Sequence, residues 1–199
     1  MTGAVNSIDR TNPRNPTTDI DSMFIDRWSP RAFEPIPLTQ TQIDSPFEAA
    51  RWAPSCFNEQ PWLFLFAAGE TDRARFMPAL VEKNQAWVKN TSLLIYLLCR
   101  RNFSHNDQAN RHAPFDAGAA WMSLALQARK LGLYGHAMAG FNREKAYEIL
   151  KVHTKEYDIM AAIAVGYRAE PDSLPELVAA AEKPSDRKTR EEVARQGTL

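Results

Sequence analysis

The sequence has little cysteine and no surplus of charge of either sign. Its 199 residues carry 24 Lys and Arg against 24 Asp and Glu, so the formal net charge is zero. A neutral chain has no broad basic field to attract nucleic acid or anionic lipid, and an anionic ligand would need a local pocket. The two cysteines, Cys56 and Cys99, are too few for a disulfide framework or a zinc cluster. They favour a reducing compartment.

Long hydrophobic runs and nucleotide-binding glycine motifs are also missing. The longest apolar runs, SLLIYLLC and MAAIAVG, are far shorter than a membrane span. Residues 1–22 lack the apolar centre of a signal peptide, so we predict a cytoplasmic protein. The eight glycines form neither G-x-G-x-x-G nor a phosphate loop, and the four histidines show no metal-ligand spacing. A bound nucleotide would therefore be held by side chains, and we predict no metal site.

Hydrophobic patterning and end signals predict the elements. The capping boxes Thr39-x-x-Gln42 and Ser45-Pro46-x-Glu48 predict a helix that begins twice or bends at Pro46, and ends before Pro54. Strands are expected over 62–67, 92–99, 134–141 and 158–167, helices over 72–82, 114–131, 142–151 and 174–182, and a helical turn at NQAWVKN. Uninterrupted apolar strands are covered on both faces, which predicts a layered sheet with helices on each side.

The helix predicted over 114–131 has little polar surface, so it should be a central element, ended by Gly132 in the left-handed conformation. No composition shift divides the chain before residue 170. We expect a flexible tail over 1–22, one domain over 23–170, and a polar arm over 171–199 that lies against another surface.

The segment RWSPR has the first pattern that suggests chemistry. Arg27, Ser29 and Arg31 are two residues apart, and the proline after Ser29 favours extended geometry. Alternate side chains of an extended segment face one way, so two guanidinium groups and a hydroxyl could hold a phosphate. The alternative is a solvated segment whose arginines pair with Asp26 and Glu34.

The loop PSCFNEQPW has the second pattern that suggests chemistry. Ser55, Asn58 and Gln60 offer neutral donors and acceptors that suit the edge of an amide-like heterocycle. Cys56 could instead be a nucleophile, but no motif ties a histidine to it as a base, so an inert thiol is the simpler reading.

The segment HAMAGF has the third pattern that suggests chemistry. Ala137, Ala139 and Gly140 are small, so a flat ring could approach the backbone and accept a hydrogen bond from an amide N–H. A close-packed strand end would have the same composition.

Together, these segments resemble the flavin-dependent nitroreductase family. The resemblance rests on DRWSPRAFEPIPL, AARWAPSCFNEQPWLFLFA, FDAGAAWMSLALQARKLGL, IAVGYRAE and the closing LPEL, DRK and EE, in family order over roughly residues 24–192. At 137–140, AMAG stands where many members have Pro-x-Glu-Gly, so the subfamily and natural substrate stay open.

The resemblance implies an α+β three-layer sandwich with a central mixed or antiparallel sheet, in an arm-exchanged homodimer whose arm 171–199 packs on the partner subunit. One FMN would lie in each of two clefts at the subunit interface. The residues that match the family's cofactor-binding segments are Arg27, Trp28, Ser29 and Arg31; Pro54, Ser55, Cys56, Asn58 and Gln60, contributed by the other subunit; Met138, Ala139 and Gly140, facing flavin N5; and Arg187 and Lys188 at the phosphate.

The activity implied is an NAD(P)H-dependent oxidoreductase. NADH or NADPH would pass hydride to flavin N5, and a nitroaromatic, quinone or similar acceptor would take the same place in a ping-pong cycle. No side chain need act as acid or nucleophile, because the flavin carries the chemistry. A flavin-binding protein without turnover, a dehalogenase or flavin-modifying enzyme on the same fold, and a Cys56-dependent hydrolase remain alternatives.

Overall fold

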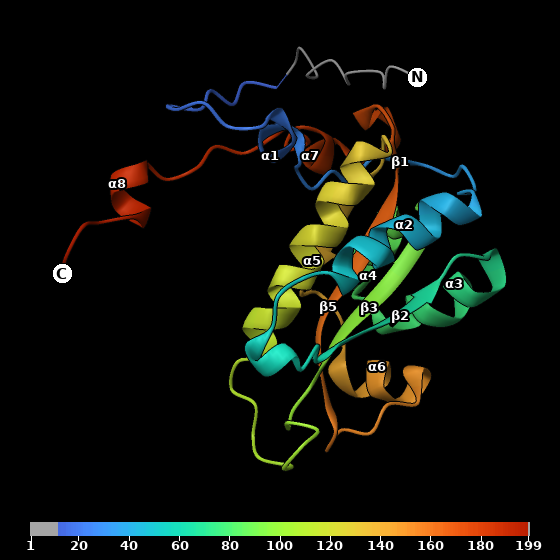
Figure 1. Ribbon diagram of the computed structural model, residues 1–199. Helices are drawn as coiled ribbons and strands as arrows, with labels where there is room; N and C mark the ends of the chain where they lie inside the picture. Colours follow the sequence, from blue (N-terminus) through green and yellow to red (C-terminus); the bar gives the residue numbers. More distant parts are fainter. Residues whose placement is uncertain (1–11, 199) are drawn as a thin grey trace.

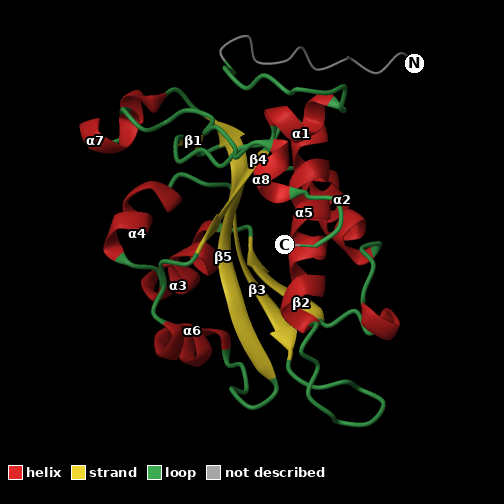
Figure 2. Ribbon diagram, turned by 90° about the vertical axis from the view of Figure 1, so that its left-hand side faces the viewer, coloured by secondary structure: helices red, strands yellow, loops and turns green. Residues whose placement is uncertain are grey.

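The computed structural model describes residues 12–198, in three layers. Figure 2 shows the sheet between α3, α4 and α6 on one face and α1, α2 and α5 on the other. The helices are α1 (Ser22–Asp26), α2 (Gln40–Arg51), α3 (Glu70–Phe76), α4 (Glu82–Val88), α5 (Ala113–Lys130), α6 (Arg143–Leu150), α7 (Glu176–Ala179) and α8 (Arg190–Val193), with 3₁₀ turns η1 (Cys56–Asn58), η2 (Met77–Ala79) and η3 (Pro171–Ser173). None of the described helices is long and apolar enough to cross a bilayer.

The sheet has five strands among the described residues, and every pairing is antiparallel. They are β1 (Phe33–Glu34), β2 (Trp62–Ala67), β3 (Leu93–Arg100), β4 (Tyr134–Met138) and β5 (Tyr157–Arg168). Their order is β1-β5-β3-β2, and β4 pairs with β5 on the same edge as β1. The predicted α+β sandwich is confirmed, and the sheet is antiparallel rather than mixed.

Strand β3 explains how one sheet supports two cores. Its side chains alternate: Tyr96 and Leu98 point to the core beneath α3, α4 and α6, while Ile95 and Leu97 point to the core beneath α2 and α5. All four are nearly inaccessible to solvent. A strand buried on both faces has no polar side of its own, which is why its sequence reads as a continuous apolar run.

Helices α2 and α5 form the layer beside which the loop 54–60 lies. Helix α2 begins once, at the Thr39 capping box, and Pro46 lies inside it. The second capping box is not used, and the Ser45 hydroxyl instead accepts a hydrogen bond from Gln127 on α5. Helix α5 ends as predicted, because Gly132 follows it with φ of 80°.

Two element predictions were wrong. The helix expected over 72–82 ends at Phe76, because Pro78 lacks an amide donor and the chain makes the turn η2 before α4 begins. NQAWVKN accordingly belongs largely to α4. The helix expected over 174–182 is also shorter, with η3 preceding a four-residue α7.

Candidate functional site

The segment Arg27–Arg31 is extended, with alternating burial. Trp28 and Pro30 are buried, whereas Arg27, Ser29 and Arg31 are only half-buried. This pattern agrees with the predicted extended geometry, in which every second side chain shares a face. The indole of Trp28 therefore lies in the core, and the arginines and the hydroxyl are left on the other side.

A cluster of three arginines lies at this segment. Burial lowers the pKa of Arg27, and the nearby Arg187 guanidinium lowers it further. Burial also lowers the pKa of Arg14, as do Arg187 and Arg27, with partial compensation from Asp186. The Nε of Arg27 is buried without a hydrogen-bond partner. We call Arg14, Arg27 and Arg187 the arginine cluster.

The alternative pairing with carboxylates is not what the structure shows. Within residues 12–198, neither Arg27 nor Arg31 forms an ion pair with Asp26 or Glu34. Asp26 is buried with one carboxylate oxygen lacking a hydrogen-bond partner. Among the described residues, Asp186 is the carboxylate recorded as acting on the arginine cluster, and it offsets only part of the charge, an arrangement that favours an anion between the cations.

Three chain segments hold the arginine cluster together. The Nη1 of Arg14 donates to the carbonyls of Ile25 at 2.8 Å and Arg27 at 2.9 Å, and its Nε donates to the Ser185 carbonyl at 2.8 Å. On the other side of the segment, one carboxylate oxygen of Glu182 accepts from the backbone N–H groups of Arg31 and Ala32. Residues near both ends of the described chain thus converge on the segment Arg27–Arg31.

The predicted pair near the C-terminus is divided by the structure. Both residues are exposed, but Arg187 joins the arginine cluster, whereas Lys188 makes no recorded side-chain contact among the described residues. Sequence reasoning missed Arg14 and Glu182. Neither lies in a motif, and a buried glutamate this far from its partners leaves no local signal.

Strand β4 lies beside the same segment. The Trp28 and Tyr134 rings meet edge-to-face at 6.1 Å, and His136 Nδ1 donates to the Pro30 carbonyl at 2.8 Å. Burial lowers the pKa of His136, and the neighbouring Arg31 charge adds to this effect. The imidazole is therefore a neutral, fixed spacer between the segment and β4. The first and third predicted site segments are neighbours.

The end of β4 is held by α4. Met138 is buried and Ala139 exposed, while the Gly140 carbonyl accepts from Val81 N at 3.1 Å and from Asn84 Nδ2 at 3.0 Å. A Cβ atom at position 140 would lie 2.6 Å from that amide nitrogen. A side chain is therefore excluded unless Asn84 moves. Asn84 is a further positioning residue that the sequence pattern did not indicate.

The loop at residues 54–60 is strained. Phe57, Asn58 and Gln60 have φ of 53°, 56° and 51°, a conformation that costs non-glycine residues about 1 kcal/mol or more each. The Ser55 hydroxyl accepts from Gln60 N at 2.9 Å, which closes the loop. Strain of this kind is concentrated at functional sites, where a side chain or amide must be presented in one geometry.

Helix α5 anchors this loop. The buried Asp116, in the first turn of α5, accepts from Cys56 N at 3.1 Å. Its partner is the backbone amide, and within residues 12–198 no side chain hydrogen-bonds to the Cys56 thiol. The structure thus supplies no base for the nucleophile alternative.

The two halves of the predicted site lie at opposite ends of α5. The loop 54–60 lies at the first turn, and the segment Arg27–Arg31 lies beside Tyr134, just past the last turn (Figure 1). The 18 residues of α5 span about 27 Å at about 1.5 Å per residue. A single small molecule cannot touch both ends within one protomer.

An exposed apolar surface covers the first half of α5. On α5, Phe115 is 80% exposed and Met122 36%, one above the other at i and i+7, with the exposed Gly118 between them. Near the first turn, Phe57 is 83% exposed and Trp52 73%. A surface with several exposed large apolar side chains is typical of a protein interface.

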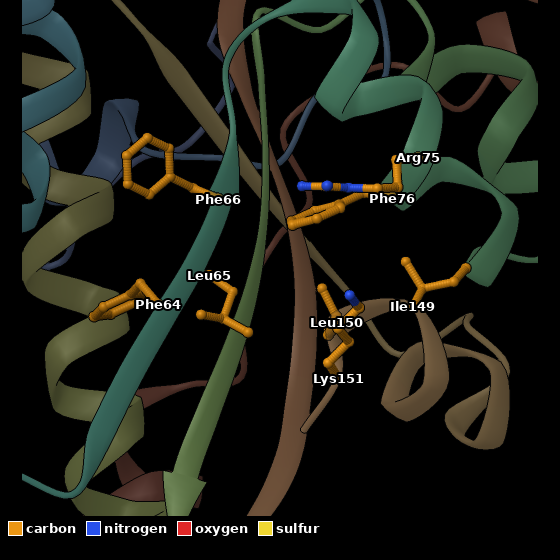
Figure 3. Close-up of a pocket in the computed structure, with 8 residues that line it drawn as sticks. All are labelled: Phe64, Leu65, Phe66, Arg75, Phe76, Ile149, Leu150 and Lys151. Carbon is orange, nitrogen blue, oxygen red and sulfur yellow. The ribbon is translucent and has the colours of Figure 1, made fainter. Parts of the chain in front are cut away.

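A pocket of about 500 Å³ lies elsewhere, between β2, α3 and α6 (Figure 3). Its lining is largely apolar, and its cations are Arg75 and Lys151, the first already paired with Asp72 at 3.1 Å. It contains none of the residues predicted from the sequence. The arginine cluster, β4 and the loop 54–60 therefore make up the candidate site.

Comparison with known proteins decides the family. The model of the nitroreductase family matches residues 25–86 and 72–167, which include Arg27–Arg31, the loop 54–60 and Met138–Gly140. The chain belongs to the nitroreductase family.

Three proteins illustrate what this nitroreductase-family chain is similar to, two of them solved structures. A structure described as an oxidoreductase containing FMN is 37% identical, with a TM-score of 0.90 over 94% of this chain and 96% of that one. A protein of Exiguobacterium sibiricum, solved in complex with FMN, is 20% identical with a TM-score of 0.74 over 92% of this chain and 99% of that one, a likeness of fold. A Streptomyces coelicolor protein, whose name describes an NADH dehydrogenase/NAD(P)H nitroreductase, is 24% identical over 83% of this chain and 92% of its own.

Proposed function

We propose that this nitroreductase-family protein is an FMN-dependent oxidoreductase that uses NADH or NADPH to reduce nitroaromatic, quinone or similar acceptors. The observation that carries the proposal is the arginine cluster, with the buried Nε of Arg27 left without a partner. The FMN in the 37% identical relative and the NAD(P)H in the name of the Streptomyces protein support it.

The residues present fit the phosphate of FMN. A phosphate monoester carries nearly two negative charges and several acceptor oxygens, which suits Arg27 and Arg187, because neither forms an ion pair with a carboxylate within residues 12–198. Arg27 and Arg187 would hold it, with Lys188 as the next cation along the chain. The Ser29 hydroxyl and the Arg31 guanidinium lie further along the same face and would meet the pyrimidine side of the ring.

The ring would lie against the end of β4. Bound FMN supplies the redox chemistry, accepting hydride from NAD(P)H and giving it to the second substrate. The exposed Ala139 leaves the backbone open to a flat ring, and Asn84 fixes that backbone through the Gly140 carbonyl. Arg31 would stabilise negative charge at the pyrimidine edge, while Trp28 anchors the segment from within the core.

The site would be completed in a homodimer. A two-fold axis across α5 would pair the apolar faces around Phe115 and Met122 and run the two helices antiparallel. The loop 54–60 of one subunit would then meet Arg27–Arg31 of the other, with Pro54, Ser55, Cys56, Asn58 and Gln60 against the flavin. The arm 171–199 would pack on the partner, and we expect this dimer in the cytoplasm.

Cofactor binding is the first test. Purified protein should be yellow, and Arg27→Ala should lose most of the FMN while staying dimeric, because one of the phosphate cations is gone. Arg75→Ala is the matched control, since Arg75 is exposed on α3, away from the candidate site. Colourless protein that does not bind added FMN would end the proposal.

Dimerisation is the second test. Phe115→Glu places a charge at the centre of the apolar face of α5, so we expect monomers in sedimentation velocity and weak FMN binding despite an intact arginine cluster. A monomeric variant that binds FMN as tightly as the wild type would show that each protomer contains a whole site.

Turnover is the third test. NADH or NADPH should be oxidised in the presence of a nitroaromatic or quinone, with the parallel double-reciprocal lines of a ping-pong cycle. Intersecting lines would contradict a shared site for donor and acceptor. Coloured protein that leaves NAD(P)H intact would indicate a flavin-binding protein without turnover.

A further inference from the structure

Arg14 lies outside the segments matched to the family, and the described chain gives it an unusual environment. Its guanidinium donates to three backbone carbonyls, those of Ile25, Arg27 and Ser185. Those carbonyls belong to the two chain segments that bring Arg27 and Arg187 together. Arg14 is thus the cross-link between the two halves of the arginine cluster.

The surroundings of Arg14 also disfavour its charge. Burial lowers its pKa, and the charges of Arg187 and Arg27 lower it further, while Asp186 compensates in part. A purely structural role would not require Arg14 to lie close to two other cations, because like charges at close range repel. The carbonyls bind Nε and Nη1, and none of its recorded bonds within residues 12–198 uses Nη2.

From this geometry we propose that Arg14 is a third cation of the FMN phosphate site, supplied by the N-terminal segment, which also sets the spacing of Arg27 and Arg187. The proposal rests on FMN being the cofactor. An anion of nearly two charges placed among the three guanidinium groups would offset most of their mutual repulsion, and it would give the unpartnered Nε of Arg27 an acceptor.

The experiment compares FMN with riboflavin, which lacks the phosphate. Flavin-free protein is titrated with each by fluorescence quenching, in the wild type, Arg14→Gln, Arg14→Lys and the control Arg75→Gln. We expect Arg14→Gln to raise the FMN Kd by about tenfold to hundredfold, as for a lost charged hydrogen bond, and to change the riboflavin Kd by less than about twofold. Arg14→Lys keeps the charge without the cross-link and should fall between Arg14→Gln and the wild type.

Ionic strength gives a second readout. The FMN affinity of the wild type should fall with added salt more steeply than that of Arg14→Gln, because one phosphate contact has been removed. This comparison of slopes separates the charge of Arg14 from a general loosening of the fold.

Each outcome bears on the proposal. Equal FMN affinity in the wild type and Arg14→Gln overturns the role of Arg14 and leaves the proposed function intact. Equal losses of FMN and riboflavin overturn it too, because they mark a purely structural effect. Should Arg14→Gln fail to fold, Arg14→Lys decides, and FMN affinity equal to that of the wild type counts against the cross-link. Wild type that binds neither flavin overturns both this inference and the proposed function.

Discussion

A methyl group at position 140 tests how tightly the end of β4 is held. In Gly140→Ala the new Cβ would lie 2.6 Å from Asn84 Nδ2 and 3.1 Å from Val81 Cγ2. The amide must move, and its 3.0 Å hydrogen bond to the Gly140 carbonyl is lost. That carbonyl keeps its bond from Val81 N. The lost bond costs about 1 kcal/mol and the overpacking about 1–3 kcal/mol, so the variant should be less stable by about 2–4 kcal/mol.

The clash can be separated from the hydrogen bond with a double-mutant cycle. Asn84→Ala alone loses the bond and should cost about 1 kcal/mol. In Gly140→Ala/Asn84→Ala the nearer obstacle is gone and only the milder contact with Val81 remains. The double variant should therefore be less destabilised than the sum of the single variants, by about 1 kcal/mol or more. Urea unfolding followed by circular dichroism on flavin-free protein measures all four proteins.

Additivity decides the outcome. If the single effects add to within about 0.5 kcal/mol, the two groups are not coupled and the close contact at Gly140 is refuted. Gly69→Ala is the control, because a Cβ there meets no atom within 4 Å. Its effect should be about 1 kcal/mol or less, since the position is only the N-cap of α3.

Three more predictions follow from buried groups. Asp116→Ala leaves the Cys56 amide without its acceptor, so urea unfolding should show a loss of about 1–3 kcal/mol, with a smaller loss in Asp116→Asn; unchanged stability would contradict the anchoring of the loop. Burial lowers the pKa of His136, whereas the imidazole in the unfolded chain has a pKa of about 6.5. Unfolding therefore takes up a proton below that pH, and Tm should fall from pH 7 to pH 5 less steeply in His136→Gln; equal slopes would exclude this origin. Cys99 is 1% exposed, and burial raises its pKa to about 11. A disulfide reagent at pH 8 should therefore modify Cys56 well before Cys99 in native, flavin-free protein, and both thiols at once in urea. Equal rates for the two thiols in the native protein would contradict the burial of Cys99.

Local features of the fold could be predicted because their causes are local. The Thr39 capping box, the stop at Gly132 and the two-sided burial of β3 each depend on a few consecutive residues. The alternation in Arg27–Arg31 follows from extended geometry alone. Pro78 shows the limit: the helical pattern continues through it, but its missing amide ends the helix.

The sequence by itself determined a layered sheet with helices on each side and the residue types that could hold a phosphate, because helix ends, strand burial and side-chain alternation are properties of short segments. The α+β sandwich and the flavin came from the resemblance to a family. Only the tertiary structure decided that Arg14 joins Arg27 and Arg187, and that the loop 54–60 lies a helix length away. Those positions depend on contacts between distant segments, and residue spacing carries no information about which distant carbonyl a guanidinium will reach. The resemblance implies a second subunit that supplies the loop 54–60, and the separation of the two halves of the site by α5 is the geometric reason that favours it.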